Sequence, residues 1–140
     1  MYRIFLVEDS PVIRENLVDH LEESLPAKVV GWAPNENDSV SWLQANPVGW
    51  DLAVVDLFLT EGNGLGVLQS CKERRAHQKM VVLTNYATND IRERCLKDGA
   101  DAVFDKSQEL DEFLHFTLSS LSRVSANDEH SVCQKCDVGG

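Results

Sequence analysis

The chain alternates short, uninterrupted apolar runs with longer segments that have helical spacing. The runs are rich in β-branched and aromatic residues, and they occupy residues 4–7, 52–55, 80–83 and 102–104, with a further run at 28–33. Continuous runs of this kind are typical of strands that are buried on both faces of a parallel sheet. The pattern therefore predicts a sheet that is covered on both sides.

The segments between these runs carry apolar residues at helical intervals. Ile13, Leu17, Leu21 and Leu25 form one such stripe, and residues 110–121 contain another. Stripes with this spacing indicate helices that pack on the sheet. Five strand-then-helix units follow one another, which predicts a five-stranded doubly wound α/β domain with helices on both faces.

The length of 140 residues fits a single domain. The strand-helix units occupy residues 1–122, which leaves 123–140 as a tail rich in Ser, Asn, Asp and Gly. We expect this tail to be disordered and too short for an effector domain. Cys133 and Cys136 form a CxxC pair within it, but one such pair is a weak sign of a metal or redox site.

The charge and hydropathy of the chain limit its expected partners. The formal net charge is −10, so we expect duplex DNA to be repelled and DNA binding to be absent. No apolar stretch approaches the length of a membrane span, and the N-terminus enters a strand without a signal-peptide pattern. These features predict a cytoplasmic protein that does not associate with a membrane.

Polar and charged side chains lie at the carboxyl ends of four of the predicted strands. They are Glu8 and Asp9, Asp56, Thr84, and Lys106. In an open parallel sheet, ligands bind in the crevice outside these strand ends, at the topological switch point. We therefore expect the five side chains to converge on one site.

The chemistry of this set favours Mg²⁺ and phosphoryl transfer. Three carboxylates, from Glu8, Asp9 and Asp56, face a single ammonium group from Lys106, and a divalent cation balances the excess negative charge. Oxygen ligands of this type suit Mg²⁺. A carboxylate beside the metal, with a hydroxyl and an ammonium opposite, can take up a phosphoryl group, and Asp56 is the predicted nucleophile.

At these positions the sequence closely resembles the receiver domains of bacterial two-component response regulators. The similarity extends from Tyr2 to about Leu121 and implies the flavodoxin-like strand order 2-1-3-4-5. The matching segments are Val7-Glu8-Asp9-Ser10, Val54-Val55-Asp56-Leu57, Val82-Leu83-Thr84, Gly99-Ala100-Asp101 and Asp105-Lys106-Ser107.

The resemblance implies a role for each residue of the metal site. Asp56 accepts a phosphoryl group from a sensor histidine kinase or a histidine phosphotransfer protein. Asp9 binds Mg²⁺ directly and Glu8 acts through water, while Asp56 and the backbone carbonyl of Phe58 complete the metal-ligand set.

The resemblance also implies a signalling switch. Thr84 and Lys106 contact the phosphoryl group, and these contacts draw in the loops after the fourth and fifth strands. The movement shifts an equilibrium between conformations that the chain already samples. The expected output is a downstream protein partner that binds the fourth helix, the fifth strand and the fifth helix. The chain would not be a stand-alone enzyme, although it takes part in phosphoryl transfer to Asp56 and in its hydrolysis.

Two departures from the common family pattern keep other functions open. Val103 stands where an aromatic switch residue is usual, and Asn85 replaces a small residue beside Thr84. The chain could therefore be a phosphorylation-independent interaction module that retains the site. Independently of these two residues, a phosphorelay intermediate that passes the group from Asp56 to a histidine on another protein also stays open. A flavin-binding function is disfavoured, because residues 8–11 do not form a Ser/Thr/Gly-rich phosphate cradle.

Overall fold

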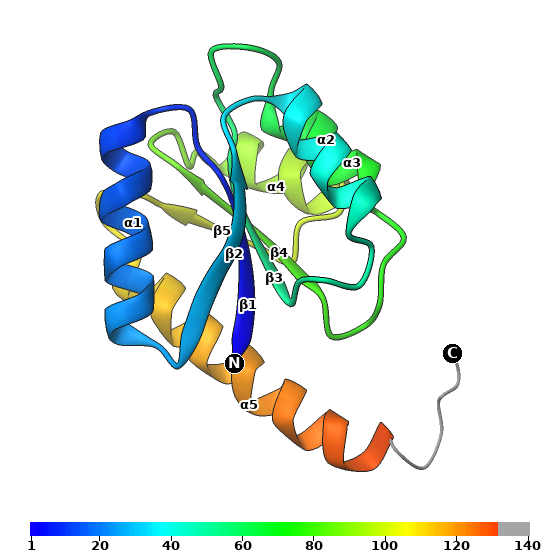
Figure 1. The fold of residues 1–140 in the computed structure, drawn as a ribbon. Helices are drawn as coiled ribbons and strands as arrows, with labels where there is room; N and C mark the ends of the chain where they lie inside the picture. The colour runs from blue at the N-terminus through cyan, green and yellow to red at the C-terminus, as the bar shows by residue number, and fades with distance from the viewer. Residues whose placement is uncertain (132–140) are drawn as a thin grey trace.

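A computed structural model describes the backbone of residues 1–131 and the side chains of residues 1–121. Strands and helices alternate along the chain, as the sequence predicts (Figure 1). The elements are β1 (Tyr2–Val7), α1 (Pro11–Ser24), β2 (Ala27–Ala33), α2 (Glu36–Ala45), β3 (Leu52–Asp56), α3 (Gly64–Ser70), β4 (Lys79–Thr84), α4 (Asn89–Lys97), β5 (Ala102–Asp105) and α5 (Leu110–Ser131).

The five strands form one parallel sheet in the order β2-β1-β3-β4-β5, which confirms the predicted flavodoxin-like order. β3 lies at the centre, and each of its five residues is buried. This burial explains why the strand reads as a continuous apolar run rather than an alternating one.

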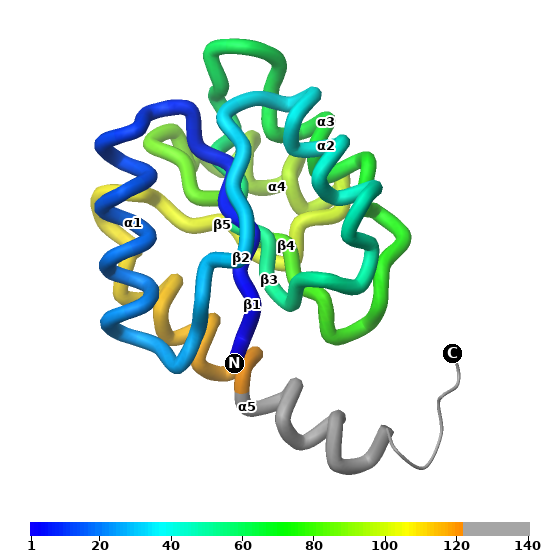
Figure 2. The backbone as a smooth tube through the Cα atoms, viewed as in Figure 1, coloured from blue at the N-terminus to red at the C-terminus, as the bar shows by residue number. Residues whose placement is uncertain are grey.

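The helices form two layers, one on each face of the sheet. α1 and α5 cover one face, and α2, α3 and α4 cover the other (Figures 1 and 2). Each layer encloses its own core, with Phe113 of α5 buried in the first and Leu68 of α3 buried in the second. Burying a side chain of this size stabilises the fold by about 2 kcal/mol.

The start of α1 fixes the acidic pair that precedes it. The hydroxyl of Ser10 accepts a hydrogen bond from the backbone N–H of Ile13, and Pro11 is the first helical residue. Both features favour a helix N-terminus at this position. Glu8 and Asp9 are therefore confined to the short connection between β1 and α1.

The last helix continues past the boundary that the sequence suggests. α5 runs to Ser131 rather than ending near residue 122, and residues 122–131 contain neither Gly nor Pro, the two strongest helix breakers. Residues 132–140 of the expected tail, with Cys133 and Cys136, lie outside the described residues. Within residues 1–131, no helix is long and apolar enough to cross a membrane.

Candidate functional site

The sheet brings the predicted site residues to one edge. Asp56 and Thr84 are the last residues of β3 and β4, while Glu8 and Lys106 directly follow β1 and β5. β1 and β3 are neighbours, with Val7 paired to Val55, so Glu8 and Asp56 leave the sheet side by side. The expected convergence at the carboxyl ends of the strands is therefore present.

Three carboxylates gather at this edge. Glu8, Asp9 and Asp56 each place one oxygen so that all three atoms lie within 4.8 Å of one another. Glu8 is 1% exposed and Asp56 is 8% exposed. Like charges this close, and so poorly hydrated, need a positive partner to remain ionised.

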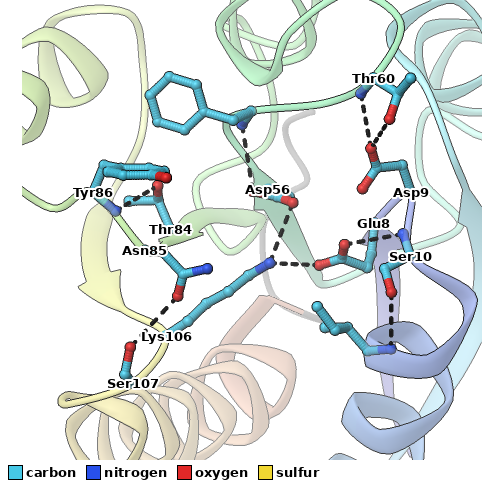
Figure 3. A network of polar contacts seen from close by, with 12 residues as sticks. Glu8, Asp9, Ser10, Asp56, Thr60, Thr84, Asn85, Tyr86, Lys106 and Ser107 are labelled. Atoms are coloured by element: carbon cyan, nitrogen blue, oxygen red, sulfur yellow. Dashed lines mark hydrogen bonds and ion pairs between the residues drawn. The ribbon is translucent and has the colours of Figure 1, made fainter.

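Lys106 supplies one positive partner. Its Nζ donates to Oε1 of Glu8 at 2.6 Å and to Oδ2 of Asp56 at 3.2 Å (Figure 3). Burial alone would lower the pKa of Lys106, but the hydrogen bonds and attraction from Glu8 and Asp56 outweigh it and raise the pKa above its ordinary value. The ammonium group therefore stays charged between the two buried acids.

The carboxyl group of Asp56 has a raised pKa. Burial raises its pKa, Lys106 lowers it and the charge of Glu8 raises it, with a net rise from 3.8 to about 6. One ammonium group thus compensates only part of the charge in the cluster. A divalent cation beside Asp56 would favour its ionised form, and the oxygen-only donor set suits Mg²⁺.

Asp9 is held differently from the other two acids. Its Oδ2 accepts two hydrogen bonds from Thr60, from the backbone N at 2.8 Å and from Oγ1 at 2.5 Å (Figure 3). The hydroxyl bond from Thr60 is the main reason that the pKa of Asp9 is lowered, against a smaller rise from burial. Sequence reasoning assigned no role to Thr60. Its only signal was its place in the loop between Asp56 and the glycines that follow.

The loop that carries Thr60 is closed by its own backbone. Gly64 N donates to the carbonyl oxygen of Leu57 at 2.9 Å, and Phe58 bridges to Asn63. The N–H of Phe58 also donates to Oδ1 of Asp56, at 3.4 Å. The metal-ligand role of the Phe58 carbonyl stays a prediction.

Contacts from α2 fasten the same loop from outside. Oε1 of Glu36 accepts from the backbone N of Asn63 at 3.0 Å, and Glu36 N donates to the carbonyl oxygen of Glu61 at 3.3 Å. Gly62 adopts a φ of 78°, a conformation that favours glycine. The shape of the loop therefore depends on residues that are distant in sequence.

Thr84 completes the group from the side of β4. It is buried, and its hydroxyl oxygen accepts a hydrogen bond from the backbone N of Tyr86 at 3.1 Å. Accepting this bond uses a lone pair and leaves the hydroxyl proton available to donate. Asn85 lies beside it, and its Oδ1 accepts from Oγ of Ser107 at 3.5 Å (Figure 3).

An exposed aromatic pair borders the site. The rings of Phe58 and Tyr86 meet edge to face with centroids 5.1 Å apart. Their side chains come from the loops that follow Asp56 and Thr84, and both are more than half exposed. The two loops are thus in direct contact at the surface next to Asp56.

Arg92 of α4 links the segments behind the site. Its guanidinium donates to the carbonyl oxygens of Ala87 at 2.9 Å and Val103 at 3.0 Å, and to Oε1 of Glu109 at 2.7 Å. Val103 is 7% exposed and packs in the core under α2, α3 and α4. Val103 therefore has a small buried side chain, and its backbone carbonyl oxygen accepts a hydrogen bond from Arg92.

Comparison with known proteins identifies the family. A family model described as "Response regulator receiver domain" matches residues 4–117. The chain belongs to this family. A solved structure, the response regulator domain of Thermotoga maritima CheB, superposes on the receiver domain with a TM-score of 0.70. At 20% identity, with 88% of this chain and 95% of that chain covered, it supports the fold alone.

Curated relatives of this receiver domain are response regulators. It is 28% identical over 106 residues to "Response regulator UvrY" of Escherichia coli O6:H1, covering 76% of this chain and 48% of that protein. It is 30% identical over 100 residues to the "DNA-binding transcriptional activator DevR/DosR" of Mycobacterium tuberculosis, covering 71% of this chain and 45% of that protein. The chain thus spans about half the length of these curated relatives.

The expectation that DNA binding is absent is wrong. DevR/DosR, which is similar to this receiver domain, carries DNA binding in its name. The net charge of −10 describes the surface of this chain, which corresponds to less than half of that relative. Electrostatic repulsion by one domain does not decide what a protein that contains the domain binds, so acidity here excludes no nucleic-acid partner.

Proposed function

We propose that this receiver domain accepts a phosphoryl group on Asp56 from a histidine kinase, with Mg²⁺, and that the modified site switches a protein-binding surface. The observation that carries the proposal is the position of Asp56. Its carboxylate lies beside two further acids, Glu8 and Asp9, and accepts a hydrogen bond from the ammonium group of Lys106. This arrangement suits a carboxylate that accepts a phosphoryl group and becomes an acyl phosphate.

The metal side of the proposal assigns ligands by chemistry and position. Asp9 and Asp56 bind Mg²⁺ directly, Glu8 acts through water, and the carbonyl of Phe58 adds a backbone oxygen. When bound, Mg²⁺ neutralises charge on the phosphoryl oxygens. The family membership and the clustering of the three carboxylates support this assignment.

The remaining residues act on the transferred group. One carboxylate oxygen of Asp56 attacks phosphorus, the P–N bond to the donor histidine breaks, and its electron pair stays with the imidazole nitrogen. Lys106 pairs with one phosphoryl oxygen and Thr84 donates its hydroxyl proton to another. Attack requires the ionised form of Asp56, which a divalent cation bound beside it would favour.

Phosphorylation with a small donor tests the proposal directly. The purified chain is incubated with acetyl phosphate and Mg²⁺, and its intact mass is measured. We expect a gain of one phosphoryl group that disappears in Asp56→Asn and when Mg²⁺ is chelated. Asp111→Asn, which changes an exposed acid at the start of α5, should keep the gain and serves as the matched control.

Two results would overturn the proposal. A wild-type chain that gains no mass under these conditions would indicate a phosphorylation-independent interaction module. A mass gain that persists in Asp56→Asn would place the phosphoryl group on another residue. A wild-type chain that is phosphorylated, while Asp9→Asn is phosphorylated far more weakly, would support both the acceptor and the metal ligand.

A further inference from the structure

The two hydrogen bonds from Thr60 fall on the same oxygen of Asp9. The backbone N and the side-chain Oγ1 both donate to Oδ2 (Figure 3). In that view the Asp9 carboxylate lies between Thr60 on one side and the carboxylates of Glu8 and Asp56 on the other. Thr60 therefore holds one end of a side chain whose other end borders the acidic cluster.

This contact is compatible with metal binding. An ionised carboxylate has about four lone-pair sites on its two oxygens, and Thr60 uses two of them on Oδ2. Neither Thr60 bond falls on Oδ1, so Thr60 leaves that oxygen to a cation. The hydrogen bonds therefore fix the orientation of the carboxylate without occupying the oxygen that a cation needs.

The donor is itself held in place. The loop of Thr60 is closed by the bond from Gly64 N to the Leu57 carbonyl oxygen, and Glu36 of α2 binds its far end at Asn63. Because this loop is already held in place, little further conformational entropy is lost at Thr60 when Mg²⁺ binds. Such support of a ligand by a neighbouring hydrogen bond is a general feature of metal sites.

We propose that Thr60 is a positioning residue for Mg²⁺, which orients the carboxylate of Asp9 so that its free oxygen faces the cation. The proposal rests on the proposed function, because it assumes that Asp9 is a metal ligand. It adds a residue outside the set of carboxylates, and it assigns to the loop between β3 and α3 a part in setting metal affinity.

Mg²⁺ titrations followed by backbone amide NMR shifts test this role, because the same spectra report whether each variant is folded. Thr60→Val keeps the shape and the backbone N–H but removes the hydroxyl donor, and it should weaken Mg²⁺ binding about 10-fold. Thr60→Ser restores the hydroxyl and should bind within about 2-fold of wild type. Asp9→Asn should abolish binding, and Glu61→Gln, a charge change on the same loop, should leave it unchanged.

Each outcome bears on a defined claim. Weaker binding in Thr60→Val with recovery in Thr60→Ser supports the positioning role. Equal affinity in Thr60→Val and wild type overturns it, and tighter binding in Thr60→Val also overturns it, because Thr60 would then compete with the metal. Absence of Mg²⁺ binding to wild type overturns the proposed metal site together with this inference. Thr60→Ala supplies a second hydroxyl deletion if the valine variant loses its dispersed spectrum.

Discussion

Lys106 is bound more closely to Glu8 than to Asp56. Its Nζ lies 2.6 Å from Oε1 of Glu8 and 3.2 Å from Oδ2 of Asp56. Glu8 is almost fully buried, and a buried carboxylate is stable only when it is paired, as it is here with Lys106. Asp56 receives the weaker share of the compensation, which fits the rise of its pKa to about 6.

Removal of the ammonium group should destabilise the fold strongly. Lys106→Met leaves Glu8 and Asp56 as adjacent buried acids, and loss of one partner from a buried ion pair costs about 3–5 kcal/mol. We expect this loss near neutral pH in urea denaturation without Mg²⁺. Acid should reduce this loss of stability by protonating the carboxylates. Mg²⁺ should restore part of the lost stability.

The matched control for this variant is Lys97→Met, which changes an exposed lysine at the end of α4. It should shift stability by less than about 0.5 kcal/mol. A Lys106→Met chain as stable as Lys97→Met, with no response to acid or Mg²⁺, would show that the ammonium group does not compensate the buried acids.

Replacement of Asp56 by asparagine should stabilise the metal-free protein near neutral pH. The pKa of Asp56 is about 6 in the folded state against 3.8 in its reference state. The folded chain therefore binds more protons than the unfolded chain between these values, so its stability falls as pH rises through this range and stays lower above it. Asn carries no charge and removes that loss.

We expect Asp56→Asn to gain about 1–2 kcal/mol near pH 7.5, less than the full linkage energy because Lys106 loses a charged partner. The gain should shrink as the pH approaches the reference value of 3.8. Thermal melts in chelator across this pH range provide the measurement. A variant less stable than wild type near neutral pH, or a gain that does not change with pH, contradicts the assigned pKa.

Gly64 leaves no room for a side chain beside Asp56. A Cβ at this position would lie 2.5 Å from the carbonyl oxygen of Asp56 and 2.9 Å from Cα of Leu57. Both are backbone atoms at the end of β3 and cannot move alone. Gly64→Ala should therefore cost about 2 kcal/mol or more in urea denaturation, and it should reduce the phosphoryl gain by displacing Asp56.

Gly66→Ala provides the comparison from the same helix. The Cβ there would meet the carboxylate of Glu36, the end of a side chain that can rotate away by releasing its hydrogen bond from Asn63 N, rather than backbone. We expect a stability change below about 1 kcal/mol, because alanine also favours the helix. The phosphoryl gain should be preserved. Equal losses in the two variants would show that crowding at Asp56 is not the cause.

Arg92 should contribute to stability through its three acceptors. Arg92→Ala leaves the carbonyl oxygens of Ala87 and Val103 and the carboxylate of Glu109 without this donor. We expect a loss of about 1–3 kcal/mol in thermal or urea unfolding. Arg94→Ala, on the same helix, breaks only an exposed pair with Asp98 and should cost less than about 0.5 kcal/mol. Similar losses of stability in Arg92→Ala and Arg94→Ala would show that the three acceptors of Arg92 do not stabilise the fold.

The parts of the site that follow strands could be read from the sequence. Asp56 and Thr84 end buried apolar runs, and parallel strands bring such ends together, so the acidic edge followed from local pattern and sheet geometry. The contact between Asp9 and Thr60 could not be read in this way. It depends on the shape of a loop that is set by Glu36, which lies 27 positions from Asn63 in the sequence.

Composition was the least reliable guide. The net charge of −10 correctly describes an acidic chain, but it led to a wrong conclusion about DNA, since partners are chosen by whole proteins and local surfaces. The polar residues at 122–131 resembled a tail, and α5 extends over them to Ser131, while the domain boundary near residue 122 stays a prediction.

β5 is the last strand in the chain and lies at the outer edge of the sheet, so the site is complete only after this strand has joined the sheet. Glu8 and Lys106, which bind each other, are separated by 98 positions along the chain. Bringing such distant residues together carries a loop-closure cost that only the assembled strands between them repay. A chain emerging from the ribosome without β5 would expose paired acids with no ammonium counterpart, so the chemical competence of Asp56 arrives only with the last strand.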